Sequence, residues 1–275
     1  MTQKHPFHLV DPSPWPLRAA TAAFRATTGG VRYRHGYNGG GFVLSFGQLR
    51  LLATRYVWWR DIVREGTFEG QHTHIVQLGL RFGRILFIVS EVRFFFAFFW
   101  AFFWGALNPP MTIATQWPPE GIEPVPTWGI PFLNTLILLL SGATVTWAHH
   151  AVKEGDQKTG FKALVITVAL GVIFTGIQIL EYVEQIHAGF TLQDAIFGSA
   201  FYMATGFHGL HVQIGTIFLA VCMMRCWYGT FRANKHVGFE AAAWYWHFVD
   251  VVWLFLFVWV YWCGGTISFT VTPIG

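Results

Sequence analysis

Long hydrophobic stretches recur along the chain, separated by short polar segments. Five are clear, and each ends at Pro, Gly or a charged residue: 78–107, 128–151, 161–181, 196–225 and 239–263. Two weaker stretches, 17–35 and 41–59, precede them and are interrupted by arginines and small residues. Because about 20 apolar residues are enough for a helix to cross the hydrocarbon layer of a membrane, the pattern predicts seven membrane-spanning helices.

Positively charged residues alternate between the predicted loops. The segments after the second, fourth and sixth spans hold Arg60, Arg64, Arg81, Lys153, Lys158, Lys162, Arg232 and Lys235. The opposite segments contain neither Lys nor Arg, and these are 36–40, 108–127, 182–195 and the tail after 263. Since Lys and Arg are enriched in loops on the cytoplasmic or matrix side, we expect the N-terminus on that side.

Composition agrees with a membrane protein. Of the 275 residues, 53% are hydrophobic and only 12% are charged, about half the charged share of a soluble domain. The net charge of +4 comes from basic loops suited to anionic lipid headgroups, so a nucleic-acid partner is not expected. We expect three regions: a polar segment 1–15, two spans with a basic interfacial loop at 16–77, and a five-span bundle at 78–275.

Glu91 lies in the middle of the third predicted span, just before a run of aromatic residues. An ionisable group at this depth is costly and is commonly functional. Its neighbours three and four positions away are all apolar, so its own helix offers no ion-pair partner. Two interpretations remain open: a proton-exchanging or reactive carboxyl, or a carboxyl that bonds to a neighbouring span for packing.

The segment 58–72 begins with paired Trp and then Arg residues at the basic end of the second span. Indole rings favour the membrane interface, and guanidinium groups bind phosphate through paired hydrogen bonds. This pattern predicts a tightly held phospholipid, and the alternative is general anchoring at the interface.

Three pairs of polar residues lie within other spans. They are His149 with His150, His208 with His211, and His247 with Asp250. The last two pairs are three residues apart and share a helix face. No Cys, Met or carboxylate cluster completes a metal coordination shell beside them. We therefore expect hydrogen bonds between helices and no metal, with His247 as the partner of Asp250.

Several strings resemble the cytochrome c oxidase subunit III family. They run from His8 to Pro16 (HLVDPSPWP), Trp58 to Asp61 (WWRD), Thr146 to His150 (TWAHH), Ala204 to Gly209 (ATGFHG), and Gly238 through Trp253. The resemblance covers essentially the whole chain, with the strings in the same order and spacing.

The resemblance implies an all-α membrane fold with seven helices in two bundles, spans 1–2 and 3–7, forming a V-shaped cleft filled with lipid. It implies a subunit without its own redox centre, packed on subunit I of the oxidase, which holds haems and copper, and on other subunits of complex IV. Such a subunit supports proton uptake and stability during turnover. We expect it in the mitochondrial inner membrane with a matrix-side N-terminus, or in a bacterial plasma membrane.

The resemblance also implies roles for individual residues. Glu91 matches the family's carbodiimide-reactive carboxyl. The lipid-contacting segment, for cardiolipin or phosphatidylglycerol, matches Trp58, Trp59, Arg60, Arg64, Glu65, Thr67 and His72. Two positions depart from the family pattern, since Trp104 and Gln71 stand where histidines are usual, which weakens any proton-collecting histidine cluster there.

Other functions remain as alternatives. A transporter-like protein would conduct protons through Glu91 and Asp250. A redox subunit would use the histidines as haem or copper ligands. The equivalent subunit of a quinol oxidase would share the same fold.

Six arginines lie in or beside the first three spans, where the family typically has an apolar residue, often Met. They are Arg32, Arg34, Arg50, Arg55, Arg84 and Arg93. An arginine at a span centre costs roughly 2.5–3.5 kcal/mol, less where the side chain reaches the interface. Either these are true arginines, or some are methionines encoded by a codon that the organelle reads differently.

Overall fold

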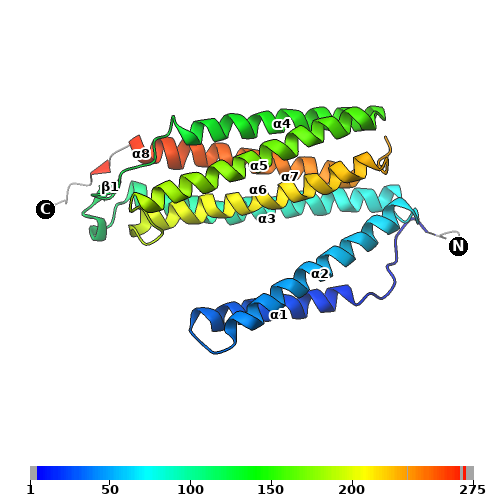
Figure 1. The fold of residues 1–275 in the computed structure, drawn as a ribbon, viewed down its shortest axis with the longest axis horizontal. Helices are drawn as coiled ribbons and strands as arrows, with labels where there is room; N and C mark the ends of the chain where they lie inside the picture. Colours follow the sequence, from blue (N-terminus) through cyan, green and yellow to red (C-terminus); the bar gives the residue numbers. More distant parts are fainter. Residues whose placement is uncertain (1–4, 234, 267–268, 271–275) are drawn as a thin grey trace. The chain divides into compact units, whose positions relative to one another are not determined.

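The chain forms two compact units, described one at a time because the structure does not fix their relative placement (Figure 1). The structure is a computed structural model and describes residues 5–233, 235–266 and 269–270. Unit 1 runs from Met1 to Leu80 and unit 2 from Arg81 to Gly275.

Unit 1 contains α1 (Trp15–Arg34), α2 (Gly40–Thr67) and the start of α3 (His74–Leu107). Unit 2 contains the rest of α3 and the helices α4 (Ile130–Glu154), α5 (Gln157–His187), α6 (Ala195–Trp227) and α7 (Val237–Phe255). A π-helix, η2 (Leu256–Cys263), continues α7 into the short α8 (Gly264–Thr266). A 3₁₀ turn, η1 (Met111–Ile113), precedes β1 (Gln116–Trp117), which pairs antiparallel with β2 (Phe269–Thr270).

The helices α1 to α7 coincide with the seven predicted spans, which confirms an all-α membrane protein. Five helices are long and apolar enough to cross a membrane: α3, α4, α5, α6 and the stretch Val237–Thr266. Among the described residues, α1 and α2 do not meet that criterion, because arginines lower their hydropathy.

Several predicted boundaries were wrong. Arg81 lies on α3, Lys153 on α4, and Lys158 and Lys162 on α5, so these residues belong to helix ends and not to loops. Helix α2 continues past residue 59 to Thr67, so Arg60 and Arg64 lie on a helix and not in a loop. Helix α5 continues past Glu181 to His187. Glu181, expected at the end of a span, therefore lies inside one.

Small residues join α1 to α2. The buried residues of the two helices are Ala22, Ala26, Gly29, Gly40 and Gly47. A Cβ atom added to Gly29 would lie 2.3 Å from the backbone nitrogen of Leu44. The two backbones therefore touch, as small residues allow between helices in a membrane.

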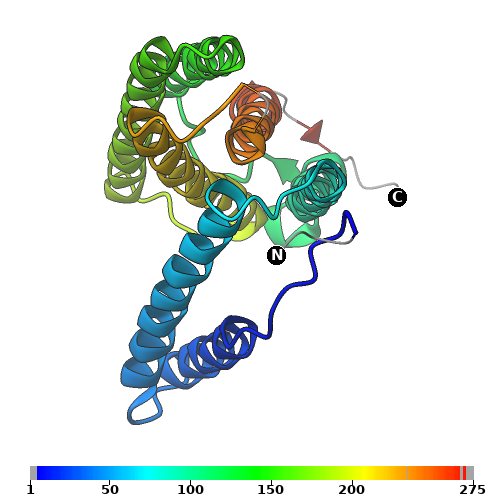
Figure 2. The same cartoon turned by 90° about the vertical axis from the view of Figure 1, so that its right-hand side faces the viewer.

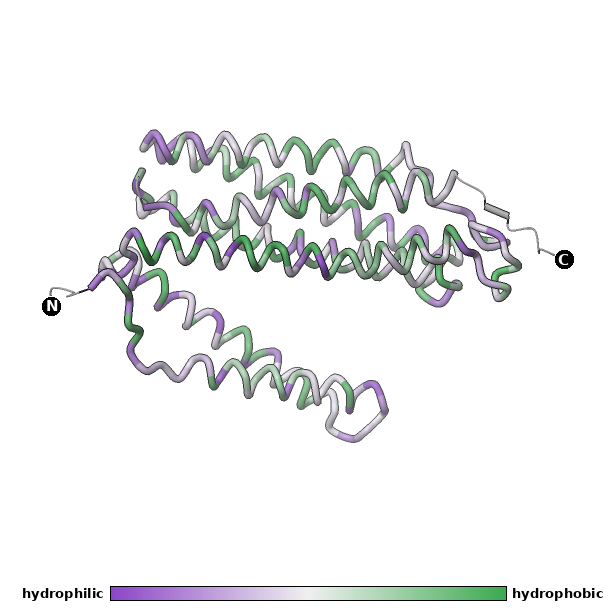
Figure 3. Tube along the Cα trace, turned by 180° about the vertical axis from the view of Figure 1, so that it is seen from behind, coloured by the Kyte–Doolittle hydropathy of each residue, from purple (hydrophilic) through white to green (hydrophobic). Residues whose placement is uncertain are grey.

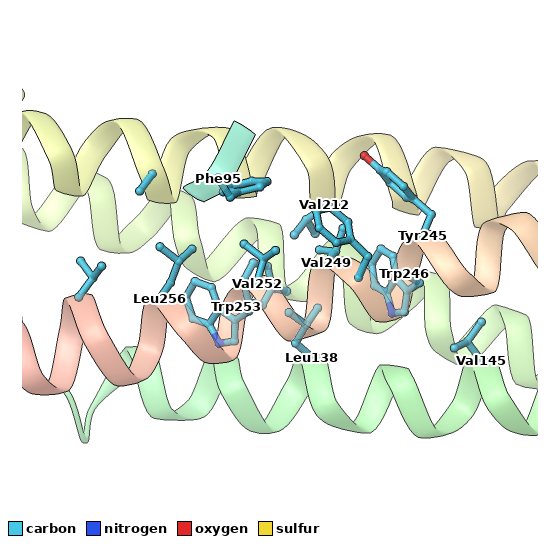
Figure 4. Packing of buried hydrophobic residues seen from close by; sticks show 14 of the residues in the cluster. Phe95, Leu138, Val145, Val212, Tyr245, Trp246, Val249, Val252, Trp253 and Leu256 are labelled. Atoms are coloured by element: carbon cyan, nitrogen blue, oxygen red, sulfur yellow. The ribbon is translucent and has the colours of Figure 1, made fainter. Parts of the chain in front are cut away.

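Large side chains form the core of unit 2. Figure 4 shows α7 and η2 presenting Trp246, Val249, Trp253 and Leu256 between the neighbouring helices. Indole groups of α7 also bond to hydroxyls of α4, since Trp246 Nε1 donates to Ser141 Oγ (2.8 Å) and Trp253 Nε1 donates to Thr135 Oγ1 (2.9 Å). The views in Figures 1 and 2 show these helices running side by side along unit 2.

Within unit 2, the part of α3 after Leu80 packs on α6 and α7 through aromatic rings. Phe94 meets Phe207 of α6 at a ring separation of 4.9 Å, and Phe95 meets Phe248 of α7 at 6.1 Å. Only 11% of the most apolar stretch of α3 is buried, against 56% for Val237–Thr266. Most of the α3 surface is therefore left for lipid or for another protein.

The ends of the unit 2 helices differ in charge. At one end of these helices, Lys153 lies in the last turn of α4, Lys158 and Lys162 lie in the first turns of α5, and Arg232 lies in the α6–α7 connection. Glu120, Glu123 and Asp194 lie in or beside the connections at the opposite ends of these helices. Figure 3 shows hydrophobic colours along the middle of the helices and hydrophilic colours gathered toward the α4–α5 end.

Candidate functional site

The predicted lipid-contacting residues of α2 divide between two helix faces. One face carries Trp58, Asp61 and Glu65, which are three or four positions apart. This face holds the N-terminal segment, since Trp15 Nε1 donates to Asp61 Oδ2 (2.8 Å) and the His8 ring lies 3.3 Å from Glu65 Oε2. Glu65 is thus engaged within the chain.

The second face carries Arg60, Arg64 and Thr67, and it presents cations outward. The side chains of Arg60 and Arg64 are 61% and 72% exposed. Each also has a carboxylate beside it, with Arg60 donating to Asp61 (2.8 Å) and Arg64 lying 3.3 Å from Glu69. The exposed Trp59 lies next to Arg60. These groups form a cationic, aromatic surface at the end of the apolar part of α2.

Asp61 connects the two faces. The hydrogen bond from Arg60 and then the bond from Trp15 lower the pKa of its carboxyl below the ordinary value. The carboxylate therefore stays ionised and partly neutralises Arg60. Its other oxygen fixes the N-terminal segment.

His72 lies against the end of α2. A Cβ atom added to Gly66 would lie 2.5 Å from His72 Nδ1, so only glycine leaves room for this ring. Unit 1 thus places all seven predicted residues on the last turns of α2 or beside them.

Glu91 has a partner on another helix of unit 2. Its Oε2 lies 2.7 Å from His211 Nε2 on α6, and the two side chains are 20% and 10% exposed. Aromatic rings surround the pair, with Phe95 at 5.0 Å and Tyr245 at 6.3 Å from the His211 ring. The carboxyl is therefore neither unpaired nor freely hydrated.

Hydrogen-bond direction limits the proton positions in this pair. His211 Nδ1 lies 2.6 Å from the carbonyl oxygen of Phe207, and a carbonyl only accepts, so Nδ1 carries a hydrogen. One further proton must lie between Nε2 and Glu91, on the ring or on the carboxyl. The pair can therefore hold one shared proton in an apolar surrounding.

The other histidine pairs bond across helices. His208 Nε2 donates to the carbonyl oxygen of Val249 on α7 (3.2 Å). His247 Nε2 lies 3.2 Å from Thr146 Oγ1 on α4. His247, the partner expected for Asp250, lies beside it, with Nδ1 at 3.7 Å from Asp250 Oδ2, which is within ion-pair distance but beyond hydrogen-bond distance. Asp250 Oδ2 also lies over Gly142, where an added Cβ would be 2.5 Å away.

His149 lies at the basic end of α4. Its ring is 5.6 Å from that of His236 and 5.7 Å from that of Phe239. Within the part of the chain that the structure describes, no group of three His, Cys, Asp or Glu residues is arranged to hold a metal ion.

The six questioned arginines have different surroundings. Five are exposed, namely Arg32, Arg34, Arg50, Arg55 and Arg93. Arg84 is the exception, with a side chain only 8% exposed, 3.8 Å from Glu240 and 4.2 Å from the Trp244 ring centroid. Arg81 also bonds to Glu240, at 3.1 Å, so Glu240 keeps a cationic partner whichever residue stands at 84.

Sequence reasoning missed a second polar cluster in unit 2. It joins Asn134 of α4, Gln178 and Glu181 of α5, and Tyr261 of η2. The available signal was the spacing of Gln178 and Glu181, three residues apart on one helix face. The predicted span ended at Glu181, so the spacing did not indicate that both residues lie inside the membrane bundle.

Comparison with known proteins identifies the family. The model of "Cytochrome c oxidase subunit III" matches residues 5–265. Proteins named cytochrome c oxidase subunit 3 are 63% identical over 263 residues in Prototheca wickerhamii, covering 96% of this chain and 99% of the relative, and 60% identical over 265 residues in Marchantia polymorpha, with the same coverage. The relative from Arabidopsis thaliana is 60% identical over 264 residues, covering 96% and 98%. With agreement along the whole helical chain, this protein belongs to the cytochrome c oxidase subunit III family.

Proposed function

We propose that this chain is a core subunit of cytochrome c oxidase, complex IV, in the mitochondrial inner membrane. In this function it packs on subunit I and other subunits, while the haems and coppers lie on the partners. Its N-terminus is on the matrix side. The named relatives in plants and algae and the charge difference between helix ends support this proposal.

Within that complex, the chain supports proton uptake and the durability of subunit I during turnover. The observation that carries this role is the Glu91–His211 pair at 2.7 Å. One proton shared between two ionisable groups can move between them without a change in net charge of the site. A packing role alone would be served equally by a neutral amide.

Replacing Glu91 by Gln in the assembled oxidase tests this role. Glutamine keeps the size and a hydrogen bond to His211 but cannot release a proton. We expect slower proton uptake and faster inactivation during turnover than in the wild type. Glu184→Gln removes a carboxyl from α5 and serves as the matched control. Unchanged uptake and durability in E91Q would leave Glu91 with a packing role only.

The outward face of α2 supports a phospholipid-binding function. Arg60 and Arg64 lie one helical turn apart beside Trp59, which suits a phosphate with its acyl chain lying along the apolar part of the helix. Asp61 and Glu69 neutralise part of this charge but leave both guanidinium groups accessible. The surface thus matches an anionic headgroup of the cardiolipin or phosphatidylglycerol type.

Counting retained lipids by native mass spectrometry tests lipid binding. The double variant Arg60→Gln and Arg64→Gln should lose at least one anionic phospholipid from the purified complex. Arg232→Gln, an exposed arginine between α6 and α7, controls for general loss of charge. Equal lipid content in the double variant and the wild type would contradict the assignment to this face.

A further inference from the structure

Glu181 lies in a hydrogen-bonded cluster that the proposed function does not use. Its side chain is almost fully buried, as are those of Asn134, Gln178 and Tyr261. The cluster joins α4, α5 and the π-helix η2, and it lies toward the ends of these helices that lack basic connections.

Every donor of the cluster bonds either to one oxygen of Glu181 or to another member of the cluster. Tyr261 Oη donates to Glu181 Oε1 (2.7 Å), and Gln178 Nε2 donates to the same oxygen (3.0 Å). Asn134 Nδ2 donates to Gln178 Oε1 (3.3 Å). Two acceptors receive nothing from the described residues, namely Glu181 Oε2 and Asn134 Oδ1.

A single proton would satisfy both of these atoms. An ionised carboxylate only accepts, so it would leave Glu181 Oε2 and Asn134 Oδ1 both without a donor in the interior, which is unfavourable. A neutral acid carries a hydroxyl on Oε2 and thereby supplies the missing donor. Asn134 and Glu181 both contact the Gln178 amide, so the two acceptors without a donor belong to one cluster.

The surroundings do not offer a cation in place of that proton. Among the described residues, no Lys, Arg or His forms a hydrogen bond or ion pair with Glu181. The titratable groups near it are Tyr261, Tyr182, Tyr202 and Glu184. Tyr182 hydroxyl bonds to Thr205 on α6 and not to the carboxyl. A buried carboxylate without a cationic partner is strongly disfavoured.

A cavity lies close to the cluster along α5. Gln185, one helical turn beyond Glu181 on α5, lines a cavity of about 890 Å³ with Glu120, Glu123 and Asp194. The cavity is in unit 2, at the end that lacks basic connections. The four residues of the cluster do not line this cavity, and Gln185 is the lining residue nearest to Glu181 along α5.

We propose that Glu181 is a proton-binding site, with a proton held on Oε2 at neutral pH and donated to the Asn134 amide oxygen, directly or through one water. The site is separate from the Glu91–His211 pair, since its groups come from α4, α5 and η2. It makes the junction of these three elements dependent on a bound proton.

Infrared difference spectra of the assembled complex test this site. At neutral pH, subtracting the spectrum of Glu181→Gln from that of the wild type should reveal the carbonyl stretch of a protonated carboxylic acid. The matched control Glu184→Gln should leave that band in place. Loss of carboxylate bands in E181Q would overturn the proposal.

A second variant keeps the carboxyl and covers the case in which E181Q fails to assemble. Tyr261→Phe removes one donor to Oε1, the carbonyl oxygen of the proposed acid. The carbonyl band of the acid should move to higher frequency because that oxygen loses a hydrogen bond. A change confined to carboxylate bands, or no change in the acid band, would contradict the proposal.

Discussion

The two units of this protein hold their helices together by opposite means. In unit 1, α1 and α2 meet along alanines and glycines and bury no large side chain between 15 and 67. In unit 2, tryptophans and phenylalanines fill the space between helices, and hydroxyls satisfy the indole groups. Backbone contact thus joins the first pair, and side-chain volume joins the bundle.

The two kinds of packing suit different functions, one that exposes helix surface and one that encloses polar groups. A seam of small residues needs little of each helix surface, so nearly all of α1 and α2 is left to contact lipid or other proteins. The unit 2 bundle encloses buried polar groups, including Glu181 and Asp250, which need a dry and packed surrounding. The proposed lipid binding therefore falls on unit 1, and the two proposed proton sites fall in unit 2.

Removing a large side chain from unit 2 should have the largest effect. Phe102 is almost fully buried, with Trp117 at a ring separation of 5.2 Å. Phe102→Ala should lower the free energy of unfolding by about 3–5 kcal/mol, the usual cost of a phenylalanine cavity. Denaturation in mixed SDS micelles measures this. Phe96→Ala, at a site 61% exposed, should stay near the wild type, and equal losses for both variants would refute an aromatic core.

Adding one methyl group to the seam of unit 1 should have the next largest effect. Gly29→Ala places a Cβ 2.3 Å from backbone that cannot turn aside, so the helices must separate, at a cost of about 1–3 kcal/mol. The neighbouring control is Gly30→Ala, whose Cβ would meet only Leu44 Cδ1 at 3.9 Å. The same denaturation assay should show G29A weaker than G30A, and no difference would mean that the seam is misplaced.

A small and pH-dependent effect is expected at the start of α5. Asp156 caps this helix by accepting a hydrogen bond from the Thr159 backbone N–H (3.0 Å). Bonds from Thr159, first its side chain and then its backbone, lower the pKa of the Asp156 carboxyl below its ordinary value. The capping interaction therefore stabilises the folded protein at any pH above the ordinary pKa of an aspartate. This stabilisation is lost as the pH falls from that value through the lowered pKa of Asp156.

Asp156→Asn isolates this contribution. Asparagine caps helices about as well as aspartate but does not titrate. The variant should match the wild type near neutral pH and lack this part of the acid sensitivity in thermal unfolding. A wild-type acid response that persists undiminished in D156N would assign the sensitivity to other carboxyls.

The last test asks whether the questioned positions hold arginine or methionine. It identifies a residue and involves no change in stability. Arg93 is exposed on α3 in a span, where arginine is costly. If position 93 is methionine, trypsin will not cut there, and peptide mass spectrometry will show one peptide across it. Cleavage after 93 would establish arginine. Methionines at positions 32, 34, 50 and 55 would raise the hydropathy of α1 and α2.

Much of this fold follows from the sequence, because apolar stretches separated by Pro, Gly and charge determine where helices can cross a membrane. The position of Glu91 within a span also follows from that pattern. Its partner His211 does not, since the two residues are 120 positions apart and only packing brings them together.

Two features were missed for local physical reasons. The hydropathy of the sequence falls at Arg60, but helix α2 continues to Thr67. The interfacial segment was therefore predicted to be a loop, whereas its residues share the faces of a helix. At Glu181 the charged residue itself was taken as the end of a span. Burial of that carboxyl depends on Asn134 and Tyr261, which lie far away in sequence and carry no pattern that marks them as its partners.

The π-helix η2 makes the contact between Tyr261 and Glu181 sensitive to the number of residues in this stretch of the chain. A π-helix closes its bonds over five residues instead of four, so each such turn accommodates one extra residue. Removing a single codon between positions 256 and 260, with the winding otherwise unchanged, would rotate Tyr261 by roughly a quarter of a turn, away from Glu181. The gene can thus make or break this hydroxyl–carboxyl contact by an insertion or deletion of three nucleotides, with both side chains unchanged.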